Sequence, residues 1–103
     1  MVPAKGVKQA TTADLQTMLK DKQKRQYLDV RTPGEYKGNH IKQFQNLPLH
    51  QIKQNAASLH KDEEVVVICQ SGMRSMQAAK ALKKAGFQQI TNIQGGMSAW
   101  NNR

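Results

Sequence analysis

The apolar run at residues 65–69, VVVIC, constrains the fold more than any other feature of this chain. Its β-branched residues favour an extended strand, and the lack of polar residues at alternate positions indicates burial on both faces. The run is far too short to cross a bilayer, which takes about 20 residues. The sequence therefore predicts a central strand of a parallel sheet and no membrane segment.

Helical and extended patterns alternate along the rest of the chain. Thr11 with Asp14 indicates a helix start, and Thr32 with Glu35 forms a capping box with Pro33 at the first helical position. Alternation of this kind predicts an α/β fold with three layers, in which helices cover both faces of a mainly parallel sheet. We expect strands at residues 7–9, 27–30, 45–49, 65–68 and 89–93, and helices at residues 11–20, 33–38, 51–59, 75–85 and after 96.

Length and charge limit the size and the partners of the domain. With 103 residues the chain has room for one hydrophobic core, so we expect a single domain over residues 1–103. Sixteen Lys and Arg against seven Asp and Glu give a net charge of +9, which attracts anions. The basic residues are scattered and aromatic residues make up only 5%, which argues against a nucleic-acid partner.

Cys69 is the only cysteine of the chain, so no internal disulfide forms. The start of the sequence has no apolar segment typical of a signal peptide, and an unpaired thiol fits the reducing cytoplasm, where we expect the protein to be. Cys69 follows the most buried predicted strand, and ligands bind at the carboxyl ends of parallel strands. Cys69 is therefore either a small buried side chain or the reactive centre.

The loop after Cys69, with the sequence CQSGMR over residues 69–74, favours the reactive role. A strand–loop–helix arrangement gathers loop amides and a helix N-terminus around the sulfur, and Gly72 permits a positive φ. Such a cradle stabilises a thiolate, and equally a persulfide. Attack on a sulfur donor, followed by removal of the outer sulfur, is covalent catalysis in two displacements. Arg74 either adds a fixed charge to this cradle or pairs outward with a carboxylate.

The motifs, taken in order, resemble those of the rhodanese family. The resemblance extends from about residue 7 to residue 100 and is carried by DVRTPGEY at 29–36, GNHI at 38–41, LPL at 47–49, VVVICQSGMRS at 65–75, GF at 86–87 and NIQGGMSAW at 92–100. It implies a single-domain sulfurtransferase of the thiosulfate type, with Cys69 as the sulfur-carrying nucleophile. The substrate-binding cradle that it implies consists of Gln70, Ser71, Gly72, Met73 and Arg74.

The partners implied are a small anionic sulfur donor such as thiosulfate and an acceptor that is cyanide or a thiol. The positive charge would also suit an acidic protein partner, such as a thioredoxin or a sulfur-accepting enzyme. Asp29, Arg31 and Ser75 are interpreted as supports of the loop, with Asp29 and Arg31 as a strand-end ion pair that need not touch substrate. A single cysteine with dispersed histidines matches no metal pattern, and no metal or organic cofactor is expected.

Three other functions remain open. A Cys-loop phosphatase or arsenate reductase would need a wider ring of donors, whereas only four residues separate Cys69 from Arg74. A non-catalytic interaction module would need no cysteine, and this chain has one. A sulfur relay between two proteins would use the same chemistry at Cys69 with different partners.

Overall fold

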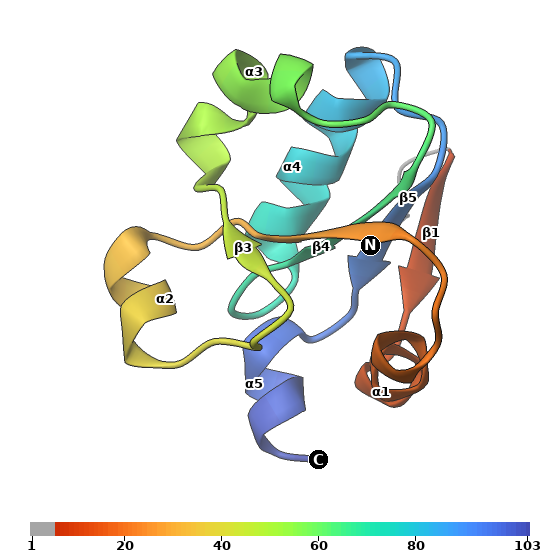
Figure 1. Cartoon of the computed structure of the whole chain (residues 1–103). Coiled ribbons are helices and arrows are strands. Elements are labelled where there is room, and N and C mark those ends of the chain that lie inside the picture. Colours follow the sequence, from red (N-terminus) through yellow and green to blue (C-terminus); the bar gives the residue numbers. More distant parts are fainter. Residues whose placement is uncertain (1–5) are drawn as a thin grey trace.

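β4 (Glu64–Ile68) lies at the centre of the fold and takes up most of the apolar run. In the computed structural model, which describes residues 6–103, five parallel strands form one sheet in the order β1-β5-β4-β2-β3 (Figure 1). Residues 65–68 are fully buried, as their unbroken apolar pattern predicts. The other strands are β1 (Val7–Ala10), β2 (Arg25–Asp29), β3 (Gln45–Asn46) and β5 (Ile90–Ile93).

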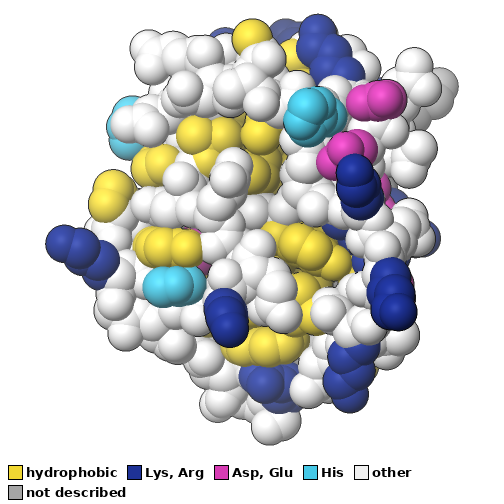
Figure 2. Space-filling view, in the orientation of Figure 1, with side chains coloured by type: hydrophobic (Ala, Val, Ile, Leu, Met, Phe, Trp, Pro, Cys, Tyr) yellow, Lys and Arg dark blue, Asp and Glu magenta, His cyan; other side chains and the backbone are white. Residues whose placement is uncertain are grey.

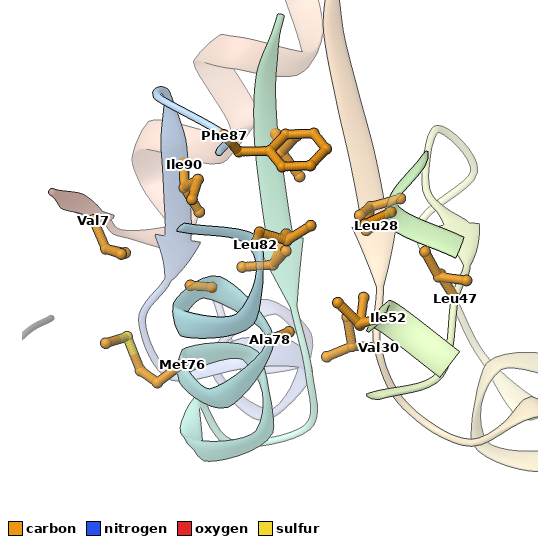
Figure 3. Close-up of a cluster of buried hydrophobic side chains, with 14 of the residues drawn as sticks. Val7, Leu28, Val30, Leu47, Ile52, Met76, Ala78, Leu82, Phe87 and Ile90 are labelled. Atoms are coloured by element: carbon orange, nitrogen blue, oxygen red, sulfur yellow. The ribbon is translucent and has the colours of Figure 1, made fainter. Parts of the chain in front are cut away.

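Helices cover both faces of this sheet, which confirms the predicted α/β fold with three layers. On one face α3 and α4 enclose an apolar cluster in which Leu82 and Phe87 pack against Leu28 (Figure 3). On the other face α1 and α5 enclose a second cluster, with Leu15 and Met97 at its centre. The helices are α1 (Thr12–Lys20), α2 (Pro33–Gly38), α3 (Ile52–Asn55), α4 (Met73–Lys84) and α5 (Gly96–Asn101).

Local signals set the helix starts where the sequence predicts them. Thr11 caps α1 through the Asp14 amide, and Thr32 caps α2 through the Glu35 amide, each with the reciprocal bond of a capping box. No helix within residues 6–103 is long and apolar enough to cross a membrane. Residues 1–5 of the predicted domain lie outside the described part of the chain.

Two predicted elements differ from the structure. The strand expected at 45–49 pairs over only two residues, because Pro48 has no amide hydrogen and the turn η1 (Leu49–Gln51) follows it at once. The helix expected at 51–59 is broken into η1, α3 and η2 (Ala56–Ser58). At the end of α3, Asn55 Nδ2 donates to the Gln51 carbonyl at 3.0 Å, so a side chain competes with the helical backbone bonds there.

The parallel register brings three strand ends to one edge of the sheet. Asp29 pairs with Ile68 and Val67 pairs with Asn92, so β2, β4 and β5 end at nearly the same level. α4 starts there at Met73, two residues before the predicted start, because Gly72 takes a φ of 107° and forms its N-cap. This edge carries Cys69 and the loop that follows it.

Candidate functional site

Cys69 lies directly after β4, and its sulfur faces the N-terminus of α4. The Gly72 amide donates to Cys69 Sγ at 2.9 Å, and the thiol in turn donates to Ser75 Oγ at 3.3 Å. The first amides of a helix have no acceptor within the helix, and together they carry a partial positive charge. A negative charge on the sulfur of Cys69 is therefore stabilised by this position, although the residue is only 1% exposed.

The loop is held from behind by α5. The amide of Met97 donates to the Cys69 carbonyl at 2.8 Å, and the amide of Ser98 donates to the Gln70 carbonyl at 2.9 Å. The carbonyl and amide of a trans peptide point in opposite directions, and no cis peptide occurs in the described residues. The amides that follow these carbonyls therefore point away from α5. Gly96 makes the contact possible, because a Cβ there would collide with the Cys69 carbonyl oxygen.

Asp29 and Arg31 brace the loop from the side of β2. Both are buried, and the guanidinium contacts both oxygens of the Asp29 carboxylate, with Nη2 at 2.7 Å from Oδ2. Arg31 Nη1 then donates to Gln70 Oε1 at 3.3 Å. On its other side, Gln70 Nε2 donates to Ser98 Oγ at 3.1 Å. The structure thus brings these two residues to the loop through the Gln70 side chain.

Arg74 is paired with a carboxylate, which is the second of the two arrangements expected for it. Its nitrogens donate to Glu35 Oε1 at 2.7 Å and to Oε2 at 2.9 Å, and both side chains are about one third exposed. The Arg74 hydrogen bonds are the main reason why the pKa of Glu35 is lowered to about 2. The pKa of Arg74 is raised chiefly by Glu35, and further by the negative charge of Cys69.

A cavity of about 270 Å³ opens beside the loop. Ser71, Gly72 and Met73 line it from the loop, and Met73 is 66% exposed. The remaining lining residues come from β1, α4 and the end of β5: Gln9, Met76, Asn92, Gln94 and Gly95. A larger cavity of about 690 Å³ lies beside the first residues of β2, β4 and β5, which is the opposite edge of the sheet from Cys69. The smaller cavity is therefore the one on the same edge of the sheet as the loop that follows Cys69.

Two polar residues behind the sulfur were not predicted from the sequence. Ser75 Oγ donates to Asn92 Oδ1, and Asn92 Nδ2 donates to Gln9 Oε1 at 2.9 Å. Asn92 lies in a strand whose four residues, ITNI, are all buried. A carboxamide within such an apolar strand is the signal that could have identified it, because buried polar groups need partners.

Comparison with known proteins agrees with this geometry. A family model described as a rhodanese-like domain matches residues 11–103. The chain is 36% identical over 94 residues to the putative sulfurtransferase YtwF of Bacillus subtilis, covering 91% of this chain and 90% of that protein. It is 38% identical over 76 residues, 74% of the chain, to the putative sulfur carrier protein YrkF of the same organism, of whose length it spans only 41%.

A solved structure shows the same fold. The crystal structure of a rhodanese-like domain protein from Staphylococcus aureus superimposes with a TM-score of 0.84 at 32% sequence identity, over 90% of each chain. The similarity in fold therefore extends over nearly the whole chain.

Proposed function

We propose that this chain, which belongs to the rhodanese-like family, moves sulfane sulfur from a small anionic donor such as thiosulfate to cyanide or a thiol through a persulfide on Cys69. The name of the relative YtwF supports sulfur transfer in general. The particular donor, the acceptor and the roles of the site residues are our proposal. A reducing compartment such as the cytoplasm is part of it, because the reaction needs an unpaired thiol.

In the first displacement the Cys69 thiolate attacks the outer sulfur of thiosulfate. The bond between the two sulfur atoms of thiosulfate breaks, and sulfite leaves with the electron pair. The product is a Cys69 persulfide whose terminal sulfur carries the negative charge. In the second displacement the acceptor attacks this terminal sulfur, and the Cys69 thiolate leaves. Cyanide becomes thiocyanate, or a thiolate becomes a persulfide, and no external oxidant is consumed.

The observation that carries this proposal is the Gly72 amide at 2.9 Å from Cys69 Sγ, at the N-terminus of α4. Amides fixed in this way stabilise negative charge on the attacking sulfur and on the terminal sulfur one bond further out. Gln70, Ser71, Gly72, Met73 and Arg74 would form the walls that receive the donor. Asp29, Arg31 and Ser75 would hold these walls in position.

A second candidate is a relay that accepts sulfur from one protein and passes it to another. Met73 favours the relay, because this large apolar side chain of the loop is 66% exposed and could contact a partner protein. The similarity to YrkF, named a putative sulfur carrier, is consistent with it. The phosphatase alternative gains no such support, because Glu35 occupies the guanidinium of Arg74 that would have to hold a phosphate.

Intact-mass measurement before and after thiosulfate, and again after cyanide, tests the proposal. We expect the wild-type protein to gain one sulfur atom and then lose it. The matched variant Cys69→Ser should gain none, because serine keeps the size of the side chain but loses the nucleophile, and its circular dichroism should match that of the wild type.

Three outcomes would contradict the proposed reaction. Thiosulfate-to-cyanide activity retained in Cys69→Ser would place the chemistry elsewhere. A folded wild-type protein that gains no sulfur from thiosulfate or from a persulfidated protein would indicate an interaction module. Hydrolysis of an aryl phosphate would indicate the phosphatase. Rapid loss of the gained sulfur to an acidic protein thiol, with slow loss to cyanide, would select the relay.

A further inference from the structure

A chain of hydrogen bonds leads away from the reactive sulfur through residues that the two displacements do not use. The bonds run from Cys69 Sγ to Ser75 Oγ at 3.3 Å, from Ser75 Oγ to Asn92 Oδ1, and from Asn92 Nδ2 to Gln9 Oε1 at 2.9 Å. The last bond runs from Gln9 Nε2 to Met76 Sδ at 3.2 Å. Asn92 is 2% exposed and Ser75 is fully buried, so bulk water does not replace these partners.

Every hydrogen bond in this series is donated in the direction away from Cys69 Sγ. The hydroxyl of Ser75 has one proton, which it gives to Asn92 or to the Gly72 carbonyl, at 3.1 Å. While it gives this proton to either oxygen, it has none to give to Cys69 and accepts the proton of the thiol. This direction suits a neutral thiol. An anionic sulfur would face the lone pairs of the Ser75 oxygen, which is unfavourable.

We propose that Asn92 and Gln9 are positioning residues. When Cys69 ionises, both carboxamides rotate so that oxygen and NH₂ exchange places, and this directs the Ser75 hydroxyl onto the anionic sulfur. In the reversed chain Gln9 Nε2 donates to Asn92 Oδ1, Asn92 Nδ2 donates to Ser75 Oγ, and Ser75 donates to Cys69 Sγ. The thiol proton leaves to water or to a buffer base, and no covalent bond forms or breaks among the other members.

The balance of hydrogen bonds supports the reversal. Oxygen and NH₂ of a carboxamide have nearly the same size, so turning them over does not change the packing of the core. The bonds given up are weak, since one ends on the thioether of Met76 and another starts from a thiol. The bond gained runs to a charged sulfur, and charge-assisted hydrogen bonds are about twice as strong as neutral ones.

The hydrogen bonds that lead away from Cys69 include no charged side chain. β5 and α5 carry no charged residue within their bounds, and Lys8 follows the opposite face of β1 from Gln9 because side chains alternate along a strand. The charged residues that surround Cys69 from β2, α2 and α4 form two ion pairs, Asp29 with Arg31 and Glu35 with Arg74. Cys69→Ser retains all four of these residues, so a pH response that is lost in this variant reports Cys69 itself.

Nuclear magnetic resonance of the isotope-labelled wild-type protein tests the reversal directly. Below the pH at which Cys69 is half ionised, we expect the Asn92 NH₂ protons to show Overhauser contacts to Gln9. Above it, they should show contacts to the Ser75 Cβ protons instead. In Cys69→Ser, which does not ionise, the contacts to Gln9 should persist at every pH. The same contacts for the wild type on both sides of the transition would overturn the proposal.

A variant pair tests what the reversal contributes. Gln9→Glu has only acceptor oxygens facing Asn92. Asn92 must then donate to residue 9 and accept from Ser75, which is the arrangement that suits a neutral thiol. We expect the midpoint pH of Cys69 alkylation by iodoacetamide to rise by about one unit, which is about tenfold slower alkylation at a fixed pH below the midpoint. Gln94→Glu is the matched control, since it adds the same charge to the same cavity without touching the chain. Equal shifts in both variants would show that charge alone acts, and would overturn the proposal.

The inference rests on the proposed function only in that an ionised Cys69 is the species that attacks the donor. Alkylation and the Overhauser contacts need no sulfur donor, so they succeed or fail independently of sulfur transfer. A reversal in a protein that never takes up sulfur would remove the proposed function and leave this inference in place. Sulfur uptake without the reversal would do the opposite.

Discussion

The Arg74 side chain connects two helices and also lies near Cys69. Its guanidinium bonds both oxygens of Glu35, and Glu35 Oε1 also accepts the Thr32 amide at the start of α2. The ion pair thus joins the first turn of α2 to the first turn of α4. Its positive charge is partly offset by Glu35, yet it lies close enough to sense the charge of Cys69.

Replacing Arg74 by alanine should weaken the use of an anionic donor more than it weakens the fold. The variant loses a positive charge near Cys69 and leaves the Glu35 carboxylate unpaired beside the site. We expect KM for thiosulfate at low salt to rise about fivefold to tenfold, as for the loss of about 1 kcal/mol of charge interaction. Lys80→Ala removes the same charge from an exposed position of α4, and should leave KM unchanged. Equal KM values for Arg74→Ala and the wild type would exclude a binding role.

Glu35 gives the fold a specific sensitivity to acid. Its pKa is about 2 in the folded protein against an ordinary value of 4.5, chiefly because of Arg74. A carboxyl group with a lowered pKa stabilises the fold fully above pH 4.5, and this contribution is lost as the pH falls from 4.5 toward 2. Chemical denaturation should therefore show a shallower pH dependence in this window for Glu35→Gln than for the wild type. Arg74→Ala should show the same flattening, and parallel curves for all three proteins would contradict the assignment.

At the scale of elements, α5 determines the position of the loop of residues 69–74. Its first amides hold the carbonyls of Cys69 and Gln70, and this approach is possible only because Gly96 has no side chain. Gly96 also takes a φ of 56°, which favours glycine. The glycine pair at the start of α5 therefore supports the loop of residues 69–74, although the two segments are far apart in the sequence.

Gly96→Ala should damage both stability and reaction rate. A Cβ at this position would lie 2.8 Å from the Gln70 carbonyl oxygen and closer still to that of Cys69, so one segment must move. We expect the free energy of unfolding to fall by about 2–3 kcal/mol and persulfide formation to slow. Gly38→Ala is the control, because nothing lies within 4 Å of a Cβ there, and it should be neutral or slightly stabilising. Unchanged stability of Gly96→Ala in denaturant titrations would refute this packing argument.

The sequence predicts those elements whose signals are local. The cap residues Thr11 and Thr32 identify two helix starts, and the apolar run identifies the central strand. Residues 51–59 have apolar residues at helical spacing, and Ile52 and Ala56 are buried, but the helix is broken where the Asn55 side chain bonds to the Gln51 carbonyl, which spacing does not reveal.

Of the candidate site, the sequence likewise predicts only the part that is local in the chain. Residues 69–75 are neighbours in the sequence, so their gathering around one loop follows from the strand–loop–helix pattern. Asn92 and Gln9 reach the back of the sulfur only because β5 pairs with β1, with Gln9 opposite Asn92. Such pairing depends on the topology of the sheet, and a local pattern contains no information about it.

At the scale of the whole molecule, the net charge of +9 is spread and not focused. Figure 2 shows Lys and Arg side chains at several places on the face in view, and fewer Asp and Glu side chains. A spread positive charge attracts any small anion through a long-range field and does not by itself select a partner. In the proposed reaction, selection of the donor is therefore left to the groups around Cys69.

The rate of persulfide formation from thiosulfate should therefore depend on salt. We expect the second-order rate constant to fall severalfold between low salt and about 0.5 M sodium chloride, where the screening length drops to roughly 4 Å. Alkylation of Cys69 by iodoacetamide, a neutral reagent, is the control and should stay constant. A thiosulfate rate that does not change with salt would show that the field of the molecule has no part in capturing the donor.

The pairing of β1 with β5 joins the first strand of the chain to the last. During synthesis the segment that carries Cys69 leaves the ribosome ahead of the segments that form β5 and α5. At that stage neither the amides of Met97 and Ser98 nor the carboxamide of Asn92 is available to it. Before β5 and α5 have folded, Cys69 thus lacks these partners, and the contacts that hold its loop from behind form only once α5 is in place.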